Sequence, residues 1–209
     1  MEFLTTVADF FLHIDAHLDA VITQYGTATY VLLFLVFFCE TGLVVTPFLP
    51  GDSLLFAAGA FAARGSLQLS ILLLLLSVAV IVGDSVNYAI GAFVGKKIFE
   101  RFLNPEHLKR AEDFYARHGG KAIVLARFVP IIRTLVPFVA GIGHMDYKRF
   151  AAFNVAGGIF WVALLLFAGY FFGTLPFVAK HFEMAILAII ALSLLPIVWE
   201  FAKSRIRRC

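Results

Sequence analysis

Four long runs of apolar residues constrain the fold of this chain more than any other feature. They lie around residues 30–45, 69–82, 150–172 and 184–199. A helix needs about 20 mostly apolar residues to cross a bilayer, and these runs approach or reach that length. The hydrophobic content of 61% and the mean hydropathy of +0.92 also exceed the values of soluble domains. The sequence therefore predicts an all-α polytopic membrane protein.

The distribution of basic residues predicts the topology. The first 63 residues contain no Lys or Arg, whereas residues 96–121 and 203–208 are rich in both. Cytoplasmic loops of membrane proteins carry this excess, so we expect both segments, and with them the C-terminus, in the cytoplasm. The net charge of +3 is small and concentrated there, so it indicates topology and no nucleic-acid partner. Residues 1–27 lack a cleavable signal pattern and predict an amphipathic helix, either at the membrane interface or packed on the protein itself.

Two short motifs recur at one offset of 82 residues and divide the chain into repeats. Phe56-Ala-Ala-Gly59 matches Phe138-Val-Ala-Gly141, and Tyr88-Ala-Ile-Gly91 matches Tyr170-Phe-Phe-Gly173. We interpret the chain as a single membrane domain. Its parts are repeat 1 at 28–95, a cytoplasmic amphipathic segment broken near Pro105 at 96–120, repeat 2 at 121–175, and a last transmembrane helix with a basic tail at 176–209.

A stretch interrupted by proline and glycine precedes the first motif in each repeat. Proline removes a backbone donor and clashes with the preceding turn, so each stretch predicts a re-entrant hairpin. Each repeat would then be a hairpin plus one transmembrane helix, with the second copy inverted relative to the first. A full crossing at residues 30–45 is the alternative, and it would reverse the N-terminus. The predicted breaks are at Pro47, Pro50, Gly51, Pro130 and Pro137.

Ionisable residues lie inside or beside these apolar stretches. Glu40 and Asp52 flank the first break, and Arg127 and Arg133 flank the second. Such residues cost about 2.5–3.5 kcal/mol each on insertion scales, so they are rarely incidental. We expect the hairpin tips to bring the two arginines to the two carboxylates. The arginines would bind an anionic group, while the carboxylates can titrate and couple to protons. The alternative is a buried charge network that only fixes packing.

A second rank of candidates lies on the polar faces of the long helices. Asp84, Asn87 and Asn154 belong to this rank, and Thr134 joins the substrate-binding candidates beside Arg133. The spacing of Gly91 with Gly95, repeated at Gly169 with Gly173, favours close helix contacts.

Metal, cofactor and enzyme chemistry lack support in the sequence. Cys39 and Cys209 are far apart, and His13 and His17 share a helical face without a third ligand. No nucleophile elbow, Walker-type loop or HExxH motif is present. We therefore expect no metal, no cofactor and no enzymatic activity, and any energy would come from a gradient.

Four segments resemble the DedA family of bacterial inner-membrane proteins, which is related to the VTT or SNARE-associated Golgi group. They are FCETGLVVTPFLPGDSLLF at 38–56, VGDSVNYAIG at 82–91, HGGKAIVLARFVPIIRTLVPFVAGIGHM at 118–145 and AGYFFGTLP at 168–176. The resemblance implies facing re-entrant hairpins and movement of undecaprenyl phosphate or phospholipid between leaflets, driven by the proton motive force and supporting envelope homeostasis. The functional positions of the family fall on Glu40, Asp52, Arg127 and Arg133.

These observations favour a carrier of a lipid phosphate whose partners are membrane lipids and protons, with a homo-oligomer possible. The headgroup would bind Arg127, Arg133 and Thr134 in competition with Glu40 and Asp52. A proton-coupled transporter of a cation or drug would instead use the carboxylates to hold its substrate. A lipid phosphatase would need a nucleophile beside the arginines, and a non-catalytic organising protein would need no transport at all.

Overall fold

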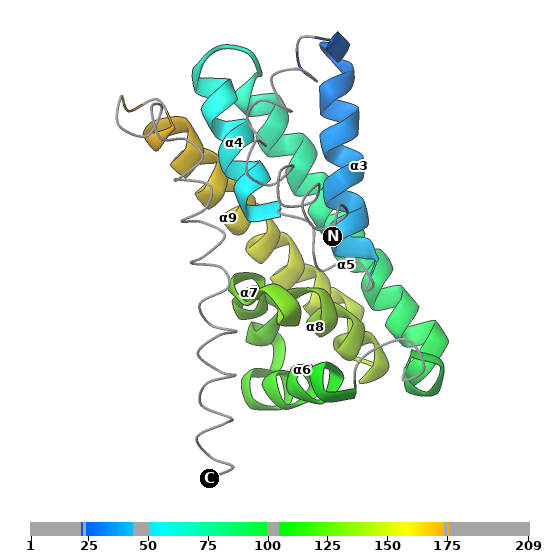
Figure 1. The fold of residues 1–209 in the computed structure, drawn as a ribbon. Coiled ribbons are helices and arrows are strands. Elements are labelled where there is room, and N and C mark those ends of the chain that lie inside the picture. Colours follow the sequence, from blue (N-terminus) through cyan, green and yellow to red (C-terminus); the bar gives the residue numbers. More distant parts are fainter. Residues whose placement is uncertain (1–21, 23, 44–50, 100–104, 174, 176–209) are drawn as a thin grey trace, which may run out of the picture. The chain divides into compact units, whose positions relative to one another are not determined.

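The computed structural model describes residues 22, 24–43, 51–99, 105–173 and 175 (Figure 1). Within these residues every regular element is a helix, which confirms the all-α prediction. Short 3-10 turns precede and follow α7, at Gly119–Lys121 and Ala126–Phe128. The α-helices are α3 (Ala28–Gly42), α4 (Gly51–Ala63), α5 (Leu69–Phe99), α6 (Pro105–His118), α7 (Ala122–Leu125), α8 (Pro130–Ile142) and α9 (Tyr147–Phe172).

Among the residues that the structure describes, two helices are long and apolar enough to cross a membrane. They are Leu69–Phe93, the apolar part of α5 with 25 residues, and α9 with 26 residues. At a rise of about 1.5 Å per residue each exceeds the roughly 30 Å of a hydrocarbon core. Large apolar side chains point outward from both, among them Leu74 at 70% exposure and Phe93 at 88%. Such a surface suits lipid better than water, so the prediction of a membrane protein is supported.

The chain divides into two compact units, and each unit is built from segments that are separated in the sequence. Unit 1 comprises Met1–Leu33, Pro50–Leu73 and Val162–Cys209, and unit 2 comprises Phe34–Leu49 and Leu74–Trp161. Helices α3, α5 and α9 each contribute residues to both units. The predicted amphipathic helix at 1–27, apart from its last few residues, and the predicted last transmembrane helix lie outside the described residues.

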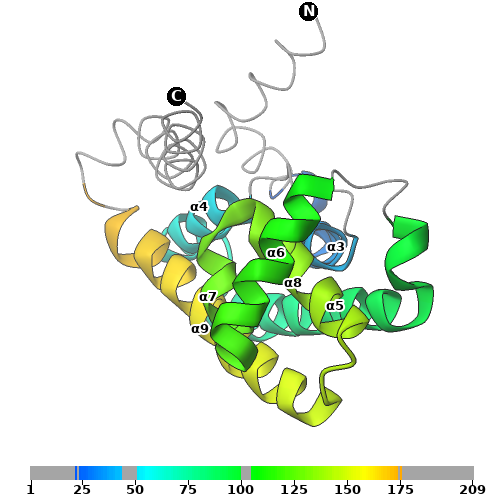
Figure 2. The same ribbon diagram turned by 90° about the horizontal axis from the view of Figure 1, so that it is seen from below.

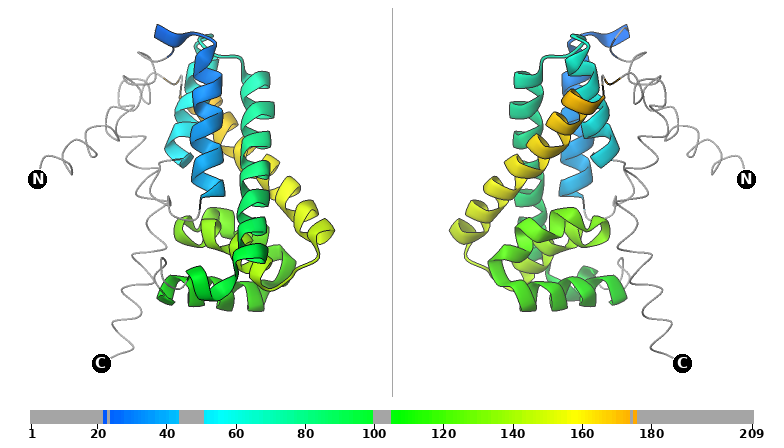
Figure 3. Two further views of the ribbon diagram at one scale, coloured as in Figure 1. Left: turned by 90° about the vertical axis from the view of Figure 1, so that its right-hand side faces the viewer. Right: turned by 90° about the vertical axis from the view of Figure 1, so that its left-hand side faces the viewer.

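In unit 1, α4 packs against the C-terminal half of α9 through glycine (Figure 3). A Cβ atom on Gly59 would overlap the carbonyl oxygen of Leu166, and one on Gly169 would overlap the carbonyl oxygen of Phe56. Only hydrogen fits at these positions, so the two backbones approach closely.

In unit 2, α8 packs against α5 through the same kind of contact. A Cβ atom on Gly141 would overlap the carbonyl oxygen of Tyr88, and one on Gly91 would overlap the carbonyl oxygen of Phe138. The two motifs matched in sequence, at 56–59 and 138–141, therefore make equivalent helix contacts. The predicted close contacts at Gly91 and Gly169 are confirmed.

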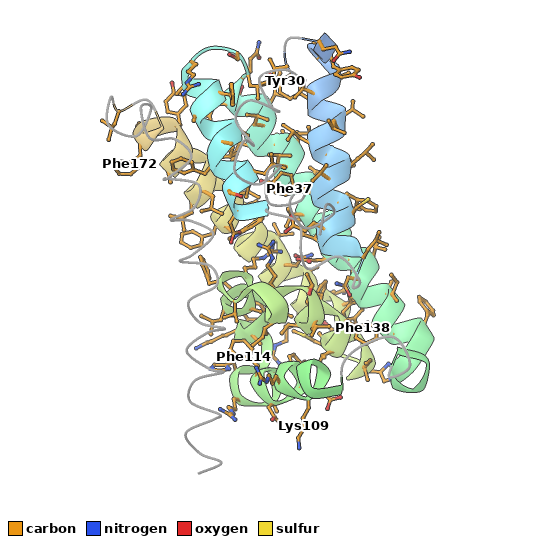
Figure 4. All side chains as sticks on the ribbon, in the orientation of Figure 1. Tyr30, Phe37, Lys109, Phe114, Phe138 and Phe172 are labelled. Atoms are coloured by element: carbon orange, nitrogen blue, oxygen red, sulfur yellow. The ribbon has the colours of Figure 1, made fainter. Side chains whose placement is uncertain are left out.

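The core of unit 2 forms where α6, α7 and α8 meet (Figure 2). Phe138 and Phe150 are fully buried in this cluster, and Phe114 of α6 packs against the cluster (Figure 4). Lys109, on the opposite side of α6, is exposed and points away from α8 (Figure 4). This arrangement confirms an amphipathic helix that begins at Pro105.

The prolines of the second predicted hairpin behave differently from each other. Pro130 is the first residue of α8 and follows Val129, whose backbone is extended, so the chain is interrupted there as predicted. The predicted break at Pro137 is wrong, because α8 continues through it to Ile142. Pro137 cannot donate to the carbonyl oxygen of Arg133, and we attribute the tolerance of this loss to the burial of α8 between its neighbours. In the first predicted hairpin, Gly51 is the first residue of α4, and Pro47 and Pro50 lie outside the described residues.

Candidate functional site

Unit 2 buries an unusual number of polar side chains for an apolar bundle. They come from helices far apart in sequence and include two acids, an arginine and two asparagines. The buried set is Glu40, Thr41, Ser77, Asp84, Asn87, Arg127, Thr134 and Asn154, and Arg133 is partly buried among them. Buried charges and amides require partners, and the partners define the site.

Arg133 forms the first ion pair of the site. Its Nη2 contacts the carboxylate of Glu40, which lies fully buried in the last turn of α3. The guanidinium also lies over the ring of Trp161, with 5.1 Å between Cζ and the ring centroid. A carboxylate and an aromatic face therefore hold the same cation. The expected meeting of Arg133 with Glu40 is observed.

Arg127 forms the second ion pair, and its partner is Asp84. The Nη2 of Arg127 donates to the Asp84 carboxylate and to Asn154 Oδ1, the latter at 2.6 Å. Both charged side chains are nearly buried, at 6% and 7% exposure. Asn154 Nδ2 in turn donates to the carbonyl oxygen of Ile81 at 3.0 Å. Arg127 thus links α5 to the N-terminal half of α9.

Two adjacent glycines of α9 make room for the Arg127 side chain. A Cβ atom on Gly157 would lie 3.2 Å from Arg127 Nε, and one on Gly158 would lie 3.4 Å from Nη2. Among the described residues, none accepts a hydrogen bond from the buried Nε of Arg127. One donor of this guanidinium is therefore not used by the pair with Asp84.

Both arginines line one small cavity. Its walls also include Asp84 and Trp161, and its volume of about 10 Å³ suits a single water molecule. The remaining lining residues are Thr41, Ile123 and Thr134. In this conformation the charges at the cavity are neutralised by one another, and a headgroup would need the cavity to open.

The other predicted residues fall into two groups. Asp52 lies half-buried in the first turn of α4, in unit 1, and so is not among the residues that unit 2 brings together. The expected pairing of Arg127 with Glu40 or Asp52 is not observed, because Arg127 pairs with Asp84, a candidate of the second rank. Its position inside an apolar run was the available signal, but a single sequence does not reveal which arginine it meets.

The chemistry of the site is that of charge pairing inside an apolar bundle. Arginine keeps its charge at any physiological pH, so each guanidinium here needs an anion. A carboxylate can instead become neutral by binding a proton. Within the described part of the chain no three His, Cys, Asp or Glu side chains gather as metal ligands.

Apolar helices that enclose buried acid and arginine pairs define a polytopic membrane protein with a charged internal site. The model of the VTT domain matches residues 49–171, and the chain belongs to this family, the DedA family. Its similarity to Protein DedA of Escherichia coli strain K12 is 50% identity over 98% of this chain and 96% of that protein. The family resemblance of the sequence is thereby confirmed.

Two other relatives extend the comparison. An uncharacterized membrane protein of Mycobacterium leprae is 39% identical over 77% of this chain and 74% of its own length. Inner membrane protein YqjA of Escherichia coli strain K12 is 34% identical over 84% of this chain and 81% of its own length. No solved structure matches the chain significantly. The names of these relatives give a membrane location and no substrate.

Proposed function

We propose that this protein moves a lipid phosphate, such as undecaprenyl phosphate or a phospholipid, between the leaflets of the bacterial inner membrane. The movement depends on the proton motive force and needs no covalent chemistry. One observation carries the proposal: Arg127 and Arg133 line one cavity inside an apolar bundle, and each is paired with a carboxylate.

The two arginines suit a phosphate headgroup. A planar guanidinium binds phosphate oxygens through two parallel hydrogen bonds, and the unused Nε of Arg127 is one such donor. Thr134 lines the same cavity, and its hydroxyl can donate to a third oxygen. The polyprenyl or acyl tail would remain in hydrocarbon while only the headgroup enters the protein.

Competition between carboxylate and phosphate provides the coupling to protons. In the observed state Glu40 neutralises Arg133. A proton bound by Glu40 removes its charge, and the arginine then favours the phosphate. Asp84 neutralises Arg127 in the same way and is the second carboxylate of the scheme, in place of Asp52, which lies in unit 1. Loss of the proton on the other side would restore the ion pair and release the lipid.

Re-entrant hairpins would let the site face either side in turn. Support comes from helix length, because α8 has 13 residues and spans about 20 Å, less than the roughly 30 Å of a hydrocarbon core. The preceding segment consists of short helices and the extended Val129. Rocking of two inverted repeats around the hairpins, with the basic C-terminal tail in the cytoplasm, would then give alternating access.

The clamp is tested by Arg133→Lys in proteoliposomes that carry a fluorescent lipid phosphate. Lysine keeps the charge and loses the planar fork, so we expect the flipping rate to fall at least about tenfold, the equivalent of roughly 1.4 kcal/mol. The exposed Arg149 gives the matched control, and Arg149→Lys should flip at the wild-type rate. Wild-type flipping by Arg133→Lys would exclude a clamp that needs the fork.

The coupling is tested by Glu40→Gln, which mimics the protonated acid. We expect its flipping rate to lose the pH dependence of the wild type while some transport remains. A wild-type pH profile would exclude Glu40 as the proton site. If the protein transports a cation, and this transport requires Glu40 and is unaffected by phosphate, the alternative of a cation or drug transporter would be favoured. If none of these substitutions changes the result of any transport assay, a non-catalytic organising protein would be favoured.

A further inference from the structure

Asn87 joins the two helices that carry the Glu40 and Arg133 pair. Its side chain is fully buried on α5, and its Nδ2 donates to two backbone carbonyl oxygens. One belongs to Thr41 of α3, at 3.0 Å, and the other to Thr134 of α8, at 2.7 Å. Thr41 and Thr134 directly follow Glu40 and Arg133 in the chain. A single amide therefore holds the backbone beside both members of the ion pair.

The end of α3 depends on such an outside donor. Thr41 lies in the last turn, where backbone carbonyls find no partner further along the helix. The hydrogen bond from Asn87 satisfies its carbonyl oxygen. One turn earlier on α5, a Cβ atom on Gly83 would overlap Thr41 Oγ1, so α5 and the end of α3 are in direct contact there. The position of Glu40 is thus set by α5.

The N-terminal part of α8 is tied to α5 by the same amide. Pro137 has no backbone N–H, so the ladder of α8 lacks the bond that would end at the carbonyl oxygen of Arg133. The hydrogen bond from Asn87 to the next carbonyl, that of Thr134, supplies a tie at this weakened turn. The backbones next to Arg133 and Glu40 are therefore both hydrogen-bonded to Asn87 of α5.

We propose that Asn87 is a positioning residue that sets the geometry of the Glu40 and Arg133 pair by fixing the backbones of both. Its Nδ2 donates only to the carbonyl oxygens of Thr41 and Thr134, and its Oδ1 has no hydrogen-bond partner in the described part of the chain, so it acts on the charged pair through these two backbones. The effect on transport rests on the proposed function, whereas the effect on the position of Arg133 does not. Loss of the amide would let the two backbones separate and would move Arg133 from the Trp161 ring.

Trp161 gives a direct readout of this position, because the Arg133 guanidinium lies over its ring. The sequence contains two tryptophans, so Trp199→Phe in the full chain leaves Trp161 as the only indole. In this background Arg133→Gln defines the signal of a ring without its cation. Asn87→Leu, which keeps most of the side-chain volume and removes both donors, should raise acrylamide quenching of Trp161 about twofold, in the same direction as Arg133→Gln.

The control is Ser77→Ala, another buried polar residue of α5, whose hydroxyl has no hydrogen-bond partner in the described part of the chain. It should leave the quenching unchanged. If Asn87→Leu is not recovered from membranes, Asn87→Ser also lacks the reach to either carbonyl and gives the same test. Unchanged quenching in the recovered Asn87 variant, with a clear change in Arg133→Gln, would overturn the proposal.

A double-mutant comparison separates positioning from general support of the fold. In a Glu40→Gln background the ion pair is already lost, so Asn87→Leu should change the quenching of Trp161 by less than half as much as it does beside intact Glu40. An equal change in both backgrounds would refute an action on the pair. If the fluorescence result holds while the wild type flips no lipid phosphate, the proposed function fails and the role of Asn87 stands.

Discussion

Removal of the Asp84 charge should destabilise the protein more than removal of the Arg127 charge. Asp84→Asn keeps the shape of the side chain and leaves the buried guanidinium of Arg127 without its anion. Breaking a buried pair in this way costs about 3–5 kcal/mol. The amide oxygen of the new asparagine can retain one neutral hydrogen bond worth about 1 kcal/mol, so we expect a loss near the lower end of that range.

The opposite change is expected to be milder. In Arg127→Gln the remaining acid can bind a proton and become neutral, which arginine cannot do. The double variant Asp84→Asn with Arg127→Gln removes both charges, and such replacements are often close to neutral in stability. The two changes should therefore be strongly non-additive, with a coupling of about 2 kcal/mol or more.

The free energy of unfolding in mixed micelles, titrated with a denaturing detergent, measures these differences. Asp113→Asn is the matched control, because Asp113 is exposed on α6 and its replacement should change stability by less than about 0.5 kcal/mol. If the losses of the two single variants simply added in the double variant, the Asp84 and Arg127 pair would not be the unit that the structure describes.

The remaining predictions concern helix contacts in unit 2, read by the same unfolding assay. Gly91→Ala should destabilise by about 3 kcal/mol because its methyl group meets the backbone oxygen of Phe138, which cannot rotate away, whereas the exposed Gly143→Ala should change little. Tyr88→Phe should lose about 1 kcal/mol because its hydroxyl donates to the carbonyl oxygen of Met145, and an equal loss in the exposed Tyr25→Phe would argue against that cause.

The helices were predictable from the sequence where one signal dominated. The apolar run at 150–172 predicted α9 to within three residues of Tyr147–Phe172. The predicted break near Pro105 coincides with the start of α6. Proline was less reliable, because its effect depends on its place within the helix. Pro130 precedes the first helical bond and begins α8, while Pro137 lies further along and α8 continues through it.

The site was predictable in its residue types and less so in its partners. Acidic residues and arginines within apolar runs were recognisable as candidates, because inserting a charged side chain into a membrane has a high free-energy cost. The pairing of Arg127 with Asp84 depends on how η2, at Ala126–Phe128, meets α5 and α9, and no local pattern encodes that meeting. The cross-link by Asn87 is equally non-local, since its two acceptors lie 46 and 47 residues away in sequence.

Each of the two matched motifs packs against a helix from the other half of the sequence, and this arrangement has a consequence for biosynthesis. The motif at 56–59 finds its glycine contact on α9, while the motif at 138–141 finds its own on α5. During translation α4 is therefore synthesised well before α9, its packing partner, and lacks this contact until α9 has been made. A nascent chain that stops before α9 holds no finished unit, so both halves of the molecule should mature together rather than one after the other.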